Sequence, residues 1–145
     1  ELGIDFRANV LILNKTPIHT PRTADLRELC RRGGAEFTRA LEETQRFMAS
    51  LVLEFQRALS LSSPLPVWIT GYSEMKAGGI FAAYTEALGE LYAAEPALGD
   101  RVFLYRHFSM NQFTIDLRAQ SRKGEDVRSA LDRIGRSYRR RILGW

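Results

Sequence analysis

The feature that most constrains the fold is the long regular stretch of residues 35–60. Its apolar side chains recur at intervals that fit one stripe along an α-helix: Phe37, Leu41, Met48, Leu51, Val52, Phe55 and Leu59. A helix of this length would extend roughly 39 Å at 1.5 Å per residue. Such a helix must bury its stripe against other parts of the chain, so we predict that it forms the scaffold of the protein.

Other segments carry the same kind of periodicity. Residues 73–94 and 125–143 each have an apolar stripe at helical spacing, and we expect both helices to pack with the long one. Residues 23–32 form a shorter candidate helix, which Gly33 ends. Ser73 is expected to cap the start of the 73–94 helix through its hydroxyl group.

Three short segments favour strands. Residues 4–13 alternate apolar side chains, and residues 67–70 are a short apolar run after a Pro-rich break. Residues 102–118 fit two strands of a hairpin, although a continuous helix over the same residues stays open as an alternative. The expected class is therefore mainly α with minor β.

Composition sets the broad limits. The chain has 145 residues, of which 45% are hydrophobic and 26% charged, so we expect one globular domain covering residues 1–145. Its single cysteine, Cys30, excludes an internal disulfide and favours the reducing environment of the cytoplasm. Because no apolar run approaches 18 residues, no transmembrane segment is expected.

The residues that hold metals and cofactors are not grouped in the sequence. His19, His107 and Cys30 lack partners at ligand spacing, and the glycine-rich loops that bind nucleotides are missing. We therefore expect neither a metal nor a cofactor. Catalysis is less expected than binding, and His107 is interpreted as a structural side chain.

One stretch offers an enzymatic alternative. Residues 65–73, which end in Gly71-Tyr72-Ser73, resemble the strand and turn before the nucleophile of lipase-like α/β-hydrolases, and residues 101–105 resemble the next strand of that family. The resemblance implies a reduced serine hydrolase around Ser73. Met75 occupies the position of the second glycine of the family motif, so the motif is incomplete.

A second resemblance is purely helical. Residues 47–58, the Pro-rich break and residues 80–92 are similar to the paired amphipathic helices of phasins, the proteins that coat storage-polymer granules. This resemblance implies a coat protein, and it assigns no residue a specific role.

The strongest candidate site is the basic C-terminal segment. Residues 118–145 carry nine basic and three acidic side chains, whereas residues 1–117 carry 12 basic and 14 acidic ones. Five arginines lie within about two and a half turns of the predicted last helix: Arg133, Arg136, Arg139, Arg140 and Arg141. Guanidinium groups suit phosphates and carboxylates, so we expect an anion-binding surface for a nucleic acid or an acidic protein.

The function predicted from the sequence is therefore non-catalytic. We expect a helical binding and assembly protein that forms homo-oligomers or binds a protein partner, because three helical stripes exceed what one small core needs. The alternative to the Arg surface is a solvated polar helix face.

Overall fold

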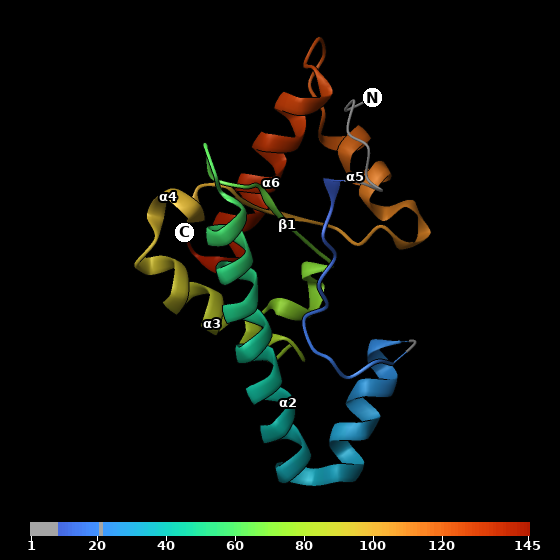
Figure 1. The fold of residues 1–145 in the computed structure, drawn as a ribbon. Helices are drawn as coiled ribbons and strands as arrows, with labels where there is room; N and C mark the ends of the chain where they lie inside the picture. The colour runs from blue at the N-terminus through green and yellow to red at the C-terminus, as the bar shows by residue number, and fades with distance from the viewer. Residues whose placement is uncertain (1–8, 21) are drawn as a thin grey trace.

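The computed structural model describes residues 9–20 and 22–145, and its architecture is mainly helical with a two-stranded parallel sheet (Figure 1). The class expected from the sequence, mainly α with minor β, is confirmed. In chain order, the described elements are α2 (Thr23–Leu59), β1 (Val67–Thr70), η1 (Tyr72–Met75), α3 (Ala82–Ala93), α4 (Pro96–Gly99), β2 (Val102–Tyr105), η2 (Ser109–Asn111), α5 (Gln112–Gln120) and α6 (Val127–Leu143).

The α2 segment consists of two arms that meet at a sharp bend. Gly34 has φ 63° and ψ −155°, a backbone conformation outside the helical region that glycine adopts readily. The longer arm after Gly34 confirms the helix predicted over residues 35–60, and the shorter arm confirms the helix predicted over 23–32. Figure 1 shows the two arms as a narrow V at the bottom of the molecule.

Two buried glutamines join the long arm of α2 to α3. The Gln45 amide donates to the carbonyl of Ile80 at 2.7 Å and accepts from the backbone N–H of Tyr84 at 3.1 Å, near the start of α3. At the other end, the Gln56 carbonyl oxygen accepts from the Tyr92 hydroxyl at 2.6 Å. Because buried polar groups are costly unless they are paired, these contacts fix one helix position against the other.

The sheet is built by a crossover. β1 and β2 pair in parallel with Val67 opposite Val102, and α3 and α4 form the connection between them. All four residues of β2 are buried, and its side chains alternate between two clusters. Val102 and Leu104 join the main core, which also contains residues of α2, α3 and α6, whereas Phe103 and Tyr105 pack with Leu131 of α6 in the second cluster.

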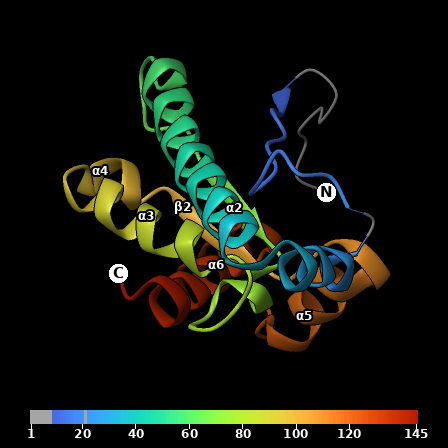
Figure 2. The same cartoon turned by 90° about the horizontal axis from the view of Figure 1, so that it is seen from below.

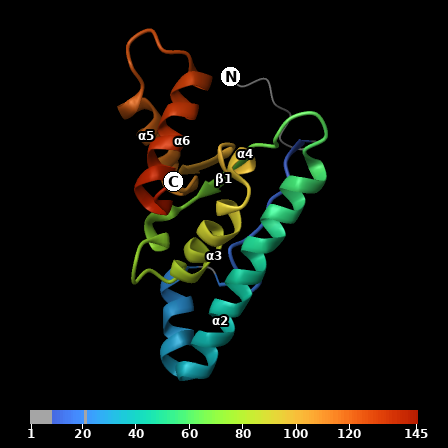
Figure 3. The same ribbon diagram turned by 90° about the vertical axis from the view of Figure 1, so that its left-hand side faces the viewer.

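α6 packs closely on β2 because it carries a glycine at the contact. A Cβ atom at Gly135 would lie 2.8 Å from Cβ of Phe103 and 2.7 Å from the hydroxyl oxygen of Tyr105. That hydroxyl donates to the carbonyl of Leu131 at 3.0 Å. Figures 2 and 3 show α6 on the opposite side of the strands from α2. α6 and α2 therefore share one core, with the strands between them.

The strand predicted over residues 4–13 is corrected in its described part. Residues 1–8 lie outside the described residues, and residues 10–13 form no strand. Ile12 is 83% exposed, whereas Leu13 packs against the core, and the neighbouring Lys15 ammonium donates to the carbonyl of Thr70 at 2.6 Å. Alternating apolar residues make a strand only where a partner backbone completes the ladder.

The helix predicted over residues 73–94 begins later than expected. Ser73 lies in the short η1 segment without a side-chain capping bond, and α3 starts only at Ala82. Gly78 has φ 74°, and the backbone N–H of Gly79 donates to the carbonyl of Lys76 at 2.8 Å in a turn. The two glycines make a loop where the apolar spacing alone predicted continuous helix.

The hairpin predicted over residues 102–118 is half correct. Its first strand is β2, but β2 pairs with β1, and residues 112–120 form the helix α5 in place of a second strand. Phe113 and Leu117 both pack against the cluster of Phe103, Tyr105 and Leu131, and their spacing of four residues places them on one helix face. Ile115, which alternation would have turned inward, is 56% exposed.

Candidate anion-binding surface

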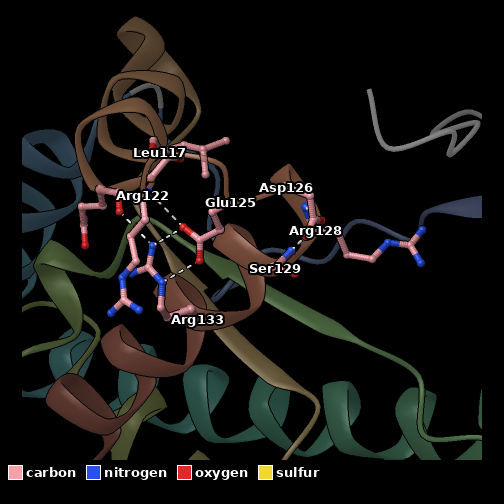
Figure 4. Close-up of polar contacts among 9 residues, drawn as sticks. Leu117, Arg122, Glu125, Asp126, Arg128, Ser129 and Arg133 are labelled. Carbon is pink, nitrogen blue, oxygen red and sulfur yellow. Dashed lines mark hydrogen bonds and ion pairs between the residues drawn. The ribbon is translucent and has the colours of Figure 1, made fainter.

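The predicted helix over residues 125–143 is confirmed as α6, and both of its ends are capped. The carboxylate of Asp126 accepts from the backbone N–H groups of Arg128 at 3.0 Å and Ser129 at 3.1 Å, as Figure 4 shows. Gly144 follows the last turn with φ 83°, in the left-handed conformation that often ends helices. These caps hold the arginine-bearing turns in a regular helix.

Four of the five predicted arginines lie on one side of α6. They surround Ser137 and line a shallow hollow of about 530 Å³, which we call the Arg face: Arg133, Arg136, Ser137, Arg140 and Arg141. Intervals of three and four residues bring these side chains together on a helix. The spacing in the sequence indicates these four arginines, although it also included Arg139, which lies elsewhere.

Arg133 is held in place from the loop before α6. Its guanidinium makes a two-pronged contact with the carboxylate of Glu125, with nitrogen–oxygen distances of 2.9 and 2.7 Å, and also donates to the carbonyl of Gln120 at 2.8 Å (Figure 4). Hydrogen bonds from Arg133, together with one from the backbone N–H of Arg122, lower the pKa of Glu125 to about 2. Glu125 therefore stays charged across the physiological pH range.

Arg136 is also oriented by neighbours within the protein. Its Nε donates to the Asp132 carboxylate at 2.7 Å, one helical turn away, and its guanidinium lies 5.4 Å from the ring centre of Phe103. The pKa of the Arg136 guanidinium is raised, and the hydrogen bond with Asp132 is the largest cause of the increase. Both contacts fix the direction in which the charge points.

Arg140 and Arg141 complete the surface without carboxylate partners in the part of the chain that the structure describes. Arg141 stacks 4.6 Å from the ring centre of Tyr138 and donates to the hydroxyl of Tyr72 at 3.0 Å. Arg140 is exposed and forms no ion pair with any described residue. These two guanidinium groups keep donors available for an anion from outside.

Arg139 does not belong to this surface, and its prediction as a member is corrected. It is 4% exposed, and its guanidinium donates to the backbone carbonyls of Gly99 and Trp145 while stacking 5.2 Å from the Trp145 ring. Burial lowers the pKa of its guanidinium below the usual value. Arg139 is set apart because its angular position on α6 faces the crossover connection and the C-terminus.

Sequence reasoning missed a polar network beneath the Arg face. The Tyr138 hydroxyl donates to the Asp116 carboxylate at 2.7 Å, and Arg106 pairs with the same carboxylate at 3.3 Å. Desolvation, followed by the hydrogen bond with Asp116, raises the pKa of Tyr138 to about 12. The only sequence signal was a tyrosine within the apolar stripe of α6, which does not indicate a partner on α5.

The residues of the enzymatic alternative are not assembled into a triad within the described chain. Ser73 is exposed in η1, with no hydrogen bond from its side chain to a histidine or lysine, and it lacks the strained backbone of a nucleophile elbow. The ring of His107 lies beside Gly71, but its Nδ1 accepts from the backbone N–H of Ser109 at 3.0 Å. The parallel strands therefore bring Ser73 and His107 to the same edge without joining them.

Neither a metal cluster nor a membrane-spanning helix occurs in the described part of the chain. Among residues 9–20 and 22–145, no group of three or more histidine, cysteine, aspartate or glutamate side chains is placed to hold a metal ion. Within the same residues, every helix is too short or too polar to cross a bilayer.

Comparison with known proteins adds no relative. No model of a protein family matches the chain, and neither a curated protein nor a solved structure matches it.

Proposed function

We propose that this chain is a non-catalytic binding and assembly protein, which forms oligomers and uses the Arg face of α6 to bind an anionic partner. A nucleic acid fits this role best, and an acidic protein surface is the other partner considered. The single cysteine fits a reducing compartment, and we place the protein in the cytoplasm.

The observation that carries the proposal is the unequal pairing of the four arginines. Arg133 and Arg136 are aimed by internal carboxylates, whereas Arg140 and Arg141 have none among the described residues. Two oriented charges beside two available ones make a surface with a net positive charge, and the two oriented side chains have little freedom to lose on binding. Planar guanidinium groups donate in pairs to phosphate oxygens, so such a surface suits a chain of phosphates.

A salt titration tests the proposal. We expect Arg136→Gln, Arg140→Gln and Arg141→Gln together to lower the affinity for a labelled single-stranded oligonucleotide, measured by fluorescence anisotropy. The slope of log affinity against log salt should fall by about 0.7 for each phosphate that is no longer neutralised, because fewer counterions are released. Glutamine keeps most of the helix propensity, so far-UV circular dichroism should be unchanged.

The matched control removes the same charge from the same tail. Arg122, Lys123 and Arg128 are exposed and lie before or at the start of α6, outside the Arg face. Their triple change to glutamine should alter the slope much less than the first triple variant. Equal effects would mean that only net charge matters, and unchanged binding in both would contradict the proposal. A fixed stoichiometry with an acidic protein would replace the nucleic acid as partner.

The rival enzymatic function rests on Ser73 at the carboxyl edge of the two parallel strands. Ligands often bind at this edge in α/β proteins, and Ser73 is exposed there. Covalent labelling of Ser73 by a fluorophosphonate probe would favour a reduced hydrolase. The phasin-like alternative predicts binding to hydrophobic polymer particles, which the Arg-face variants would not change.

A further inference from the structure

One side of α2 carries apolar side chains that the rest of the described chain leaves in contact with solvent. Phe47 is 61% exposed and Phe55 is 37% exposed, and the partly buried Leu51 lies between them at steps of four residues. Ala40 and Ala58, both exposed, continue this α2 outer face toward its ends. Figure 3 shows the helix at the edge of the molecule.

Charged residues along one flank of the α2 outer face form a symmetric pattern. Glu43, Arg46, Glu54 and Arg57 are all exposed and alternate in sign along the helix. Glu43 and Arg57 are each seven residues from position 50, and Arg46 and Glu54 are each four residues from it. A half-turn about position 50 therefore exchanges negative with positive positions.

We propose that a second copy of this chain packs on the α2 outer face in an antiparallel arrangement, with the two-fold axis near Ser50. The proposal rests on the oligomer formation in the proposed function, and it names the surface and the geometry. A two-fold axis places Glu43 opposite Arg57 of the second copy and Arg46 opposite Glu54. A parallel pair would place each charge opposite its own like charge, which is unfavourable.

The positions of the apolar residues indicate nearly the same place for the two-fold axis as the charged residues do. Phe47 and Phe55 are related by position 51, and Ala40 and Ala58 by position 49, so an axis near position 50 brings the large side chains together in the middle. The alanines then lie opposite each other at the two ends, where small side chains let helices approach closely. Burying the exposed phenylalanines provides the driving force, and the flanking charges select the direction.

The contacts within one chain leave these charges usable. Arg46 pairs with Glu86 at 3.2 Å, and Arg57 pairs with Glu54 and Glu95 at 2.7 Å, which holds both guanidinium groups at the rim of the outer face. A guanidinium has five N–H donors and can accept a further carboxylate. Glu43 forms no ion pair with any described residue, so it remains available to a second copy.

Light scattering on the full chain gives the first test. We expect a mass about twice 16.5 kDa at high protein concentration, and Phe47→Glu should return the mass to that of one chain. Ile115→Glu is the matched control, because Ile115 is exposed to a similar extent on α5 and should leave the dimer intact. Circular dichroism checks that both variants fold, and Phe47→Ala serves if the glutamate variant does not.

Cysteine cross-linking tests the direction of the pair. In a Cys30→Ser background, chains with Glu43→Cys mixed with chains with Arg57→Cys should be joined by a short bismaleimide. Either variant alone should give little cross-linked product, since each position lies far from its own copy in an antiparallel pair. Efficient cross-linking within one variant would overturn the antiparallel geometry. A mass of one chain at all concentrations, or a dimer that Phe47→Glu leaves unchanged, would overturn the interface.

These outcomes are separable from the anion-binding proposal. The triple change of Arg136, Arg140 and Arg141 to glutamine should leave the dimer mass unchanged, because those residues belong to α6, which lies on the opposite side of the strands from α2 (Figure 3). The Phe47→Glu variant should still bind the oligonucleotide, with the affinity expected of one chain. Loss of both properties in Phe47→Glu with normal circular dichroism would mean that the two surfaces are not independent, which contradicts the proposed geometry.

Discussion

At the residue scale, Glu125 is a side chain whose pKa the fold lowers clearly. Arg133 and the backbone of Arg122 lower the pKa of Glu125 to about 2, whereas an unfolded glutamate titrates near its ordinary value of about 4.3. The unfolded chain thus binds this proton more readily than the folded one. The contribution to stability is complete above about pH 4.3 and is lost as the pH falls from there toward 2.

This shift is measurable by carbon NMR of the side-chain carboxyl group. We expect a titration midpoint near pH 2 in the parent chain and a return toward 4.3 in Arg133→Gln, because the two-pronged contact is then absent. Arg140→Gln is the control, since Arg140 is on the same face without touching Glu125. If the titration midpoint of Glu125 is the same in Arg133→Gln as in the parent chain, the contact is not maintained in solution.

Single residues also show which features of the structure the sequence could not predict. Charge and spacing identified Arg133, Arg136, Arg140 and Arg141, but they could not separate Arg139, whose burial depends on carbonyl groups supplied by Gly99 and Trp145. Gln45 and Gln56 were not predicted as core residues, because an amide is buried only where distant partners satisfy it. Such pairings depend on tertiary structure, and the local sequence carries no trace of them.

At the element scale, Gly135 in α6 and Gly89 in α3 both lie inside helices, but replacing them by alanine should change stability in opposite directions. Gly135→Ala should lower the free energy of unfolding by about 1–3 kcal/mol, because the added Cβ would overlap Phe103 and Tyr105 and press α6 away from β2. Gly89→Ala should raise it by about 1 kcal/mol, since its Cβ would meet Nε1 of Trp145 only at 3.9 Å while helix propensity improves. Urea unfolding followed by circular dichroism measures both, and equal effects would contradict the packing.

Elements with long regular periods were predictable, and most short ones were not. The long arm of α2 and α6 followed from apolar spacing, and β1 followed from a short apolar run after the Pro-rich break. Within the predicted hairpin of residues 102–118, the second half could be a strand or a helix, because alternation over a few residues fits either structure. Its helical form is decided by the neighbours of Phe113, which stacks 6.3 Å from Trp68 and packs edge-on against Tyr105 at 5.4 Å.

At the scale of the whole molecule, the two proposed surfaces lie on opposite sides of the strands. α2 and α6 lie on opposite sides of the molecule (Figure 3), so a second copy bound at α2 would leave α6 free on each chain of the pair. A dimer of this form presents two Arg faces to one long polyanion. Binding at the second face then occurs at a raised effective concentration, so overall affinity exceeds that of a single chain when the partner spans both faces.

The bend at Gly34 divides α2 into two arms, and the short arm has fewer buried contacts with the rest of the chain than the long arm. Along the short arm, Leu26 is the single fully buried side chain, and the ion pair of Arg27 with Glu74 ties that arm to η1. Because the backbone at Gly34 interrupts the helical hydrogen-bond ladder, opening of the short arm need not spread into the long one. Amide hydrogen exchange should therefore show residues 23–33 exchanging orders of magnitude faster than residues 45–56, and uniform protection across Gly34 would refute this. The short arm would then be an independent unit of local unfolding, which the chain can release at little cost to its core.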